Sequence, residues 1–139
     1  MNIGQAARSS GVPAKTIRYY ESIGLIEPAA RSESGYRTYD QRDVETLRFI
    51  LRARNLGFPV NDVAKLLTLW RDKQRSSAQV KQLARRHLED IDTKIAELAA
   101  LRATLTDLVE RCQGDNRPDC PILLDLAESR SAESKSPKS

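Results

Sequence analysis

Apolar and polar residues alternate along the first 26 positions at the three- and four-residue spacing of short helices. The first stretch has an apolar side made by Ile3, Ala6 and Ala7. Ser10-Gly11 interrupts the pattern, and Pro13 suits the first position of a second helix, because its missing N–H would be unpaired there. Gly24 can end that helix in a left-handed conformation. The pattern predicts a helix-turn-helix, although an ordinary helical hairpin would share it.

The next segment, EPAARSESGYRTYDQRD, breaks the helical pattern. Pro28 stops the preceding helix, and Ser34-Gly35 lies between two short segments that can pair as a hairpin. Arginines and tyrosines surround this turn: Arg31, Tyr36, Arg37 and Tyr39. On an exposed hairpin they can contact phosphate and sugar, which predicts the wing of a winged helix. Alternatively, the segment is a solvated loop whose tyrosines pack on the core.

Two further helices are predicted before residue 71. Asp40 can cap VETLRFILRARN, which ends at Gly57, and VNDVAKLLTLW follows Pro59. Their apolar positions recur at helical spacing: Val44, Leu47, Ile50, Leu51, Val63, Leu66, Leu67 and Trp70. We expect these helices to pack beneath the first two and to complete a small core.

Residues 76–112 contain neither proline nor glycine. A helix over this range would be about 55 Å long. Its apolar seam is made by Ala84, Leu88, Ile91, Ile95, Leu98, Leu105 and Val109, and only Arg102 interrupts it. A domain of some 70 residues cannot cover so long a stripe, so we predict a homodimer in which a second chain supplies the partner helix. Folding back onto its own domain is the alternative.

Charge and composition narrow the possible partners. The chain has 139 residues, of which 40% are hydrophobic and 30% charged, as in a soluble helical protein. Residues 1–60 hold nine Lys and Arg against six Asp and Glu, so the positive excess lies where a polyanion would dock. No apolar run has the length of a membrane span or a secretory signal, and we expect a cytoplasmic protein whose thiols stay reduced.

Both cysteines lie in CQGDNRPDCPI, before a short amphipathic helix predicted over residues 121–126. Cys120 would occupy the N-cap of that helix, where the helix dipole favours a thiolate. The only histidine, His87, is about 37 Å away along the long helix, so few further ligands are available. Two soft ligands suit a monovalent ion such as Cu(I), but a redox pair or idle thiols fit the spacing equally well.

Along nearly its whole length the chain resembles the MerR family of transcription regulators. TIRYYESIGLI and RSESGYRTY resemble the family's DNA-binding domain, and the long helix resembles its dimerisation helix. CQGDNRPDCPI resembles the metal-binding loop of the copper-responsive CueR/HmrR subgroup. The resemblance implies a mainly α fold: a winged helix-turn-helix domain, a long antiparallel coiled-coil dimerisation helix and a C-terminal metal-binding loop. The corresponding ranges are 1–70, 71–111 and 112–127, followed by a disordered tail over 128–139.

The resemblance also implies roles for particular residues. Those expected to contact DNA are Thr16, Arg18 and Tyr19 on the recognition helix and Arg31, Tyr36 and Arg37 on the wing. Cys112 and Cys120 would bind one Cu(I) per subunit, or Ag(I) or Au(I). Where subgroups that sense divalent ions have a cysteine, this chain has Ser77, which would shield the loop of the partner subunit.

Such regulators act on promoters whose two elements are too far apart. Metal binding is expected to select a dimer shape that bends and untwists the DNA for RNA polymerase, and copper-efflux genes are the expected targets. A redox switch based on a Cys112–Cys120 disulfide is the main alternative. A copper chaperone or small enzyme is disfavoured, because the sequence shows no nucleophile–base pair, phosphate loop or hydrolytic metal site.

Overall fold

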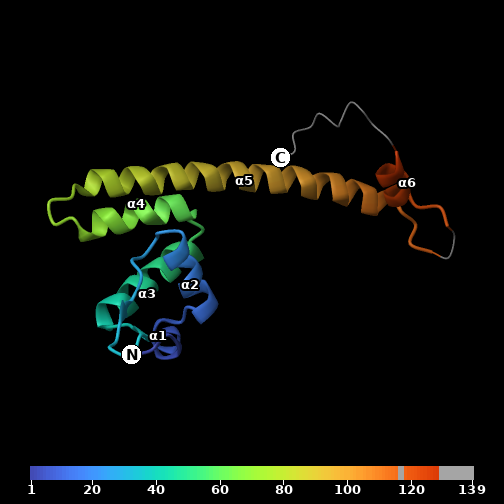
Figure 1. Cartoon of the computed structure of the whole chain (residues 1–139). Helices are drawn as coiled ribbons and strands as arrows, with labels where there is room; N and C mark the ends of the chain where they lie inside the picture. Colours follow the sequence, from blue (N-terminus) through green and yellow to red (C-terminus); the bar gives the residue numbers. More distant parts are fainter. Residues whose placement is uncertain (116–117, 129–139) are drawn as a thin grey trace. The chain divides into compact units, whose positions relative to one another are not determined.

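The computed structural model describes residues 1–115 and 118–128, and the tail expected to be disordered lies almost entirely outside this range. Over the described residues the chain is mainly helical, as predicted (Figure 1). The helices are α1 Ile3–Ser10, α2 Ala14–Ser22, α3 Gln41–Asn55, α4 Val60–Arg71, α5 Ser77–Arg111 and α6 Pro121–Ala127, and the strands are β1 Ala30–Arg31 and β2 Arg37–Thr38. None of the described helices is long and apolar enough to cross a membrane.

The chain divides into two compact units, the first covering Met1–His87 and the second starting at Leu88. In the first unit, α1 packs against α2 and α3, and α3 packs against α4. The core between these helices is made of fully or almost fully buried side chains, chiefly Ala6, Val12, Ile17, Leu47, Ile50, Val63 and Leu67. Short helices of this kind are stabilised by burying one apolar face rather than by intrinsic propensity.

The turn between α1 and α2 requires a glycine. Gly11 has φ +83°, and a Cβ at this position would lie 3.3 Å from Leu51 of α3. The hydroxyl of Ser10 accepts a hydrogen bond from the Val12 amide at 3.1 Å, which satisfies a buried donor in the turn. α2 begins at Ala14, so Pro13 is its N-cap rather than its first residue, one position away from the prediction. Gly24 has φ +78°, the left-handed conformation expected after the helix.

The predicted hairpin follows α2. Its strands pair antiparallel, with Ala30 opposite Thr38 and Arg31 opposite Arg37. Gly35 in the connecting turn has φ +87°. The predicted cap of α3 is also present, since the Asp40 carboxylate accepts from the Asp43 amide and the Asp43 carboxylate accepts from the Asp40 amide, both at 3.0 Å.

The start of α5 belongs to the first unit. Leu83 is buried, and Ala84 packs against the first unit's core, so this expected seam residue already has apolar neighbours within its own chain. His87 stacks on Phe58 with ring centroids 4.3 Å apart, and its Nε2 lies 2.8 Å from the Leu56 carbonyl oxygen. These contacts join α5 to the turn between α3 and α4.

The second unit contains the rest of α5, the cysteine segment and α6. The long helix ends at Arg111, as the absence of proline and glycine predicted. Most of its predicted seam is exposed in the single chain, with between 57% and 64% of the surface accessible for Leu88, Ile95, Leu98, Leu105 and Val109. An apolar stripe left exposed on a helix of this length is what a coiled-coil partner would cover.

Candidate metal centre and nucleic-acid interface

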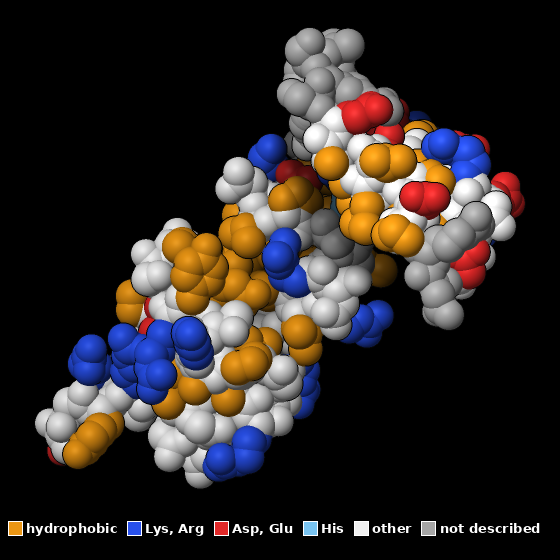
Figure 2. Space-filling view, turned by 90° about the vertical axis from the view of Figure 1, so that its right-hand side faces the viewer, with side chains coloured by type: hydrophobic (Ala, Val, Ile, Leu, Met, Phe, Trp, Pro, Cys, Tyr) orange, Lys and Arg blue, Asp and Glu red, His pale blue; other side chains and the backbone are white. Residues whose placement is uncertain are grey.

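One face of α2 is buried and the other is open. Ile17 and Tyr20 pack into the core, which turns Arg18 and Tyr19 toward solvent. Tyr19 is about half exposed, at 54%, and Thr16 is half-buried beside them. Exposed basic and aromatic groups on the second helix of a helix-turn-helix are suited to contact phosphates and base edges. Figure 2 shows one dense cluster of Lys and Arg side chains on the face drawn, with other basic side chains apart from it.

The hairpin presents its residues unequally. Tyr36 is 74% exposed, and Arg31 is exposed with its guanidinium donating to the Gly35 carbonyl at 2.8 Å. Arg37 is only half-buried, and its Nη1 lies 2.8 Å from Oε1 of Glu21. Tyr39 is 4% exposed and packs into the core, so of the two hairpin tyrosines only Tyr36 is available for contacts outside the chain.

Glu21, which was not among the residues expected to have a functional role, is a buried carboxylate on α2. Its side chain is 5% exposed, and its Oε2 accepts hydrogen bonds from the Tyr39 hydroxyl at 3.0 Å and from the Ala29 amide at 3.2 Å. Burial and this neighbouring carboxylate raise the pKa of the Tyr39 phenol. One signal was available in the sequence: Glu21 follows Ile17 by four residues and therefore shares its inward face.

The structure brings the two cysteines together. Cys112 directly follows α5, Cys120 is the N-cap of α6 in an extended conformation, and their Sγ atoms are 3.8 Å apart. Gly114, between them in the sequence, has φ +68°, a conformation that favours glycine. Both thiols are free and half-buried, and the distance is far longer than the roughly 2.05 Å of a disulfide bond.

The environment of Cys120 favours its thiolate. Hydrogen bonding from the Leu123 amide at the start of α6 is the main cause that lowers the pKa of Cys120, and the Cys112 thiol and the Ile122 amide add to it. A thiolate is the form that binds soft metal ions and the form that acts as a nucleophile. The structure confirms Cys120 as the N-cap of α6, and the lowered pKa of its thiol is the effect expected at that position.

The donor set near these thiols is small. Within residues 1–115 and 118–128, no group of three or more His, Cys, Asp or Glu side chains could hold a metal ion. The two adjacent sulfurs are soft ligands, of the kind that soft metal ions prefer. Ser77 lies at the first position of α5, in the other compact unit.

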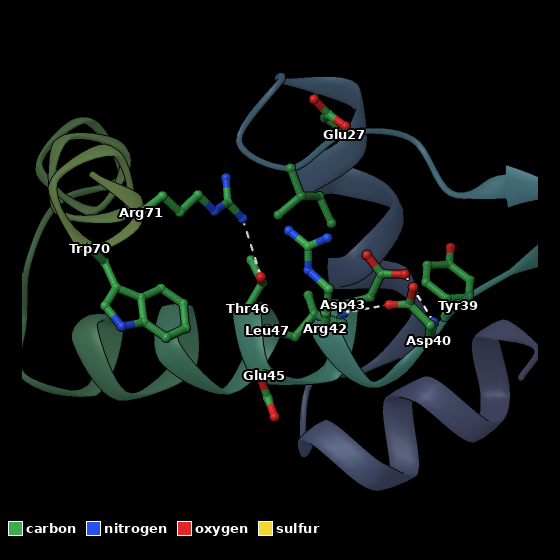
Figure 3. A pocket seen from close by; sticks show the side chains of 11 residues that line it. Glu27, Tyr39, Asp40, Arg42, Asp43, Glu45, Thr46, Leu47, Trp70 and Arg71 are labelled. Carbon is green, nitrogen blue, oxygen red and sulfur yellow. Dashed lines mark hydrogen bonds between the residues drawn. The ribbon is translucent and has the colours of Figure 1, made fainter. Parts of the chain in front are cut away.

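A pocket of about 440 Å³ in the first unit has a different character (Figure 3). Its lining includes Asp40 and Asp43, which cap α3, and Arg71, which donates to the Thr46 hydroxyl at 3.2 Å. Burial raises the pKa of Asp43, while the Asp43 amide lowers that of Asp40. These charged groups serve the helix cap and the contact between α3 and α4, and we assign the pocket no ligand.

Comparison with known proteins adds a family context to this geometry. The family model described as "MerR HTH family regulatory protein" matches residues 1–69, and the model described as "MerR, DNA binding" matches residues 44–108. PA4778 of Pseudomonas aeruginosa, an uncharacterized HTH-type transcriptional regulator, is 62% identical, with 91% of this chain and 96% of PA4778 covered. HmrR of Sinorhizobium medicae is 52% identical over 95% of this chain and 90% of its own. CueR of Salmonella typhimurium is 40% identical over 91% and 92%.

Two solved structures of transcription regulators are also similar to this chain. The transcription regulator PbrR691 from Ralstonia metallidurans, in complex with lead(II), has a TM-score of 0.79 and 34% identity, with 91% of this chain and 99% of that one covered. MerR from Bacillus megaterium, in complex with mercury(II), has a TM-score of 0.70 and 36% identity, over 92% and 100%. Both relatives were therefore crystallised with a soft heavy-metal ion.

Proposed function

Since this chain belongs to the MerR family of helix-turn-helix transcription regulators, we propose that it activates copper-efflux promoters in response to Cu(I). The observation that carries the proposal is the pair of free thiols 3.8 Å apart at the junction of α5 and α6. Its partners would be promoter DNA, a second copy of the chain and RNA polymerase, and it would act in the cytoplasm.

DNA binding would use the exposed side of the first unit. We assign contacts to Arg18, Tyr19 and Thr16 on α2 and to Arg31 and Tyr36 on the hairpin, because these side chains are exposed or lie beside exposed ones. Arginine and tyrosine donate to phosphate oxygens, while the groove-facing side of α2 would read base edges. The positive excess of the first half of the sequence supports this placement.

The choice of Cu(I) rests on the donor set. Two thiolates without a third ligand suit a soft monovalent ion, and Ag(I) or Au(I) would fit for the same reason. The similar solved structures contain lead(II) and mercury(II), so family membership alone does not identify the metal. We therefore infer it from the ligands that this chain provides. We propose that Ser77 of the partner subunit shields the site without adding a ligand, which would disfavour divalent ions.

Coupling to transcription would run through the two helices that carry the cysteines. Binding at both thiolates would fix the end of α5 relative to the start of α6, since Cys112 follows one and Cys120 caps the other. In a dimer built on the α5 seam, that constraint would select one dimer shape, and DNA bent and untwisted by this shape would be the output.

An anaerobic Cu(I) titration of the reduced protein against a strong competing chelator tests the metal assignment, with X-ray absorption on the product. We expect one tightly held Cu(I) per chain with two sulfur neighbours. The Cys112→Ser and Cys120→Ser variants should lose this affinity and the copper response in a transcription assay, yet still bind the promoter. A copper response that survives in either variant would refute the assignment, as would a third or fourth neighbour.

A redox switch on the same pair is a second candidate. The contact between two free thiols and the lowered pKa of Cys120 also favour oxidation to a disulfide. This alternative predicts activation by peroxide without metal, accompanied by a mass decrease of two hydrogens per chain. A transcription assay with peroxide and with Cu(I), each added alone, decides between the two, and mass spectrometry reports the state of the thiols, because a metal sensor would respond to Cu(I) without forming the disulfide.

A further inference from the structure

Glu21, at the end of α2, holds both ends of the hairpin. Its Oε2 accepts from the amide of Ala29, just before β1, at 3.2 Å, and from the hydroxyl of Tyr39, just after β2, at 3.0 Å. Its Oε1 lies 2.8 Å from Nη1 of Arg37 within β2. One carboxylate on the recognition helix thus contacts the residue before the hairpin, its second strand and the residue after it.

The burial of this carboxylate makes its partners important. The Glu21 side chain is 5% exposed and that of Arg37 35% exposed. A charge removed from water is costly unless a paired charge and hydrogen bonds compensate it, so the carboxylate keeps the Arg37 guanidinium beside it. The contact is an ion pair between an almost buried carboxylate and a half-buried guanidinium.

Arg31 provides a natural comparison within the same hairpin. It lies directly opposite Arg37 in the strand pairing, yet it is exposed and donates to the Gly35 carbonyl at 2.8 Å. Among the described residues no carboxylate forms an ion pair with Arg31. Two arginines at matched positions therefore have different surroundings: Arg37 is half-buried and paired with the Glu21 carboxylate, whereas Arg31 is exposed.

From this geometry we infer that Glu21 is a positioning residue for DNA binding, which fixes the wing to the recognition helix through Arg37, Tyr39 and Ala29. Arg37 then serves this internal contact, and Arg31 is the wing arginine that neutralises phosphate. The inference rests on the proposed DNA-binding role of this unit, and it reverses the expectation that Arg37 holds the DNA backbone.

The salt dependence of binding separates the two roles. Each phosphate neutralised by a cationic side chain adds about 0.9 to the slope of the logarithm of affinity against the logarithm of salt concentration. Losing an arginine that contacts phosphate therefore lowers the slope by about 1. An arginine that only positions the wing makes no phosphate contact of its own, so once Arg31 has been replaced its loss should not lower the slope further.

The experiment compares Arg37→Ala with Arg31→Ala in the full chain. The ligand is a fluorescent duplex selected from random-sequence DNA with the wild-type protein, and the dissociation constant is measured over a series of salt concentrations. We expect Arg31→Ala to lower the slope by about 1 and Arg37→Ala to weaken binding roughly tenfold, whereas Arg37→Ala added to Arg31→Ala should lower the slope no further. A further fall of about 1 when Arg37→Ala is added to Arg31→Ala would overturn the inference.

A double-mutant cycle tests the role of Glu21 itself. If Arg37 acts through Glu21, Arg37→Ala should cost no further affinity in a Glu21→Gln background, because the contact is already broken. An equal loss in both backgrounds would show that the two residues act independently and would contradict the inference. Thermal denaturation followed by circular dichroism checks that each variant is folded, with Tyr39→Phe as a milder change if Glu21→Gln unfolds. Tyr39→Phe should also weaken binding, and it should lower the slope no further when it is added to Arg31→Ala.

Failure of the inference can be told apart from failure of the proposed function. If the wild-type protein selects no duplex, DNA binding by this unit is refuted and the positioning role of Glu21 is refuted with it. If it binds with a clear salt slope, the comparison of Arg31→Ala and Arg37→Ala decides the positioning role alone.

Discussion

Cys112 and Cys120 are close in space but occupy opposite electrostatic positions. Cys112 follows the C-terminal end of α5, where the helix dipole disfavours negative charge, and Cys120 caps the N-terminal end of α6, where amides donate to its sulfur. At neutral pH, Cys120 is therefore expected to be deprotonated more often than an ordinary thiol. Metal affinity should fall with acidification, because protons compete for the ligand sulfurs.

Alkylation kinetics test this asymmetry. In the Cys112→Ser variant the Leu123 amide is retained, so the pH midpoint of iodoacetamide reaction at Cys120 should be lower in the folded protein than in the urea-unfolded chain. The sign follows from the hydrogen bond: it stabilises the thiolate, and the thiolate is lost as the pH falls through the lowered pKa. Liquid chromatography with mass spectrometry measures the rate at each pH. A midpoint in the folded protein at or above that of the unfolded chain would contradict the role of the α6 amides.

At the residue scale, the sequence predicted the cysteine pair but not the role of Glu21. The closeness of Cys112 and Cys120 could be predicted, because a short loop between two helix ends leaves them few alternatives. Glu21 was missed, since the partners that make a buried carboxylate tolerable lie 8, 16 and 18 residues further along the chain. Only the fold that brings the hairpin back onto α2 reveals them.

At the level of elements, the turn between α3 and α4 depends on a glycine and on the contact with α5. Gly57 has φ +89°, and a Cβ there would lie 3.3 Å from Nε2 of His87. Gly35 in the hairpin has nearly the same backbone conformation, with φ +87°, but open space around it. The two glycines thus share the backbone requirement and differ in side-chain crowding.

We predict that Gly57→Ala destabilises the protein more than Gly35→Ala does. The left-handed conformation costs a residue with a Cβ roughly 1–2 kcal/mol, and this term applies to both. The crowding of His87 applies only to Gly57, so its additional loss should disappear in a His87→Ala background. Urea denaturation gives the free energies of unfolding. Equal losses for the two alanine variants would show that α5 adapts to the added methyl group.

The elements themselves were largely predictable. Apolar spacing, glycines and prolines identified all six described helices and the hairpin, since these signals are local. The sequence did not predict that the first turns of α5 belong to the first unit, because residues 76–112 form one uninterrupted helical pattern. What separates Leu83 and His87 from the rest of the helix is their burial against a core made by other segments.

For the whole molecule, we predict that the exposed seam of α5 mediates dimerisation. Leu98→Asp places a charge on the predicted interface and should shift the protein toward monomer, whereas Thr93→Asp adds the same charge away from the seam and should not. Size-exclusion chromatography with light scattering reports the mass of each variant. A Leu98→Asp protein that remains dimeric would place the interface elsewhere.

The exposed seam makes the stability of α5 depend on protein concentration. If α5 hides its leucines only by pairing, mass action makes the apparent stability of that helix depend on concentration, and each tenfold dilution removes about 1.4 kcal/mol of the free energy supplied by pairing. Melting temperatures measured at different concentrations are then not interchangeable. The number of chains available would itself control the fraction assembled, before any effector binds.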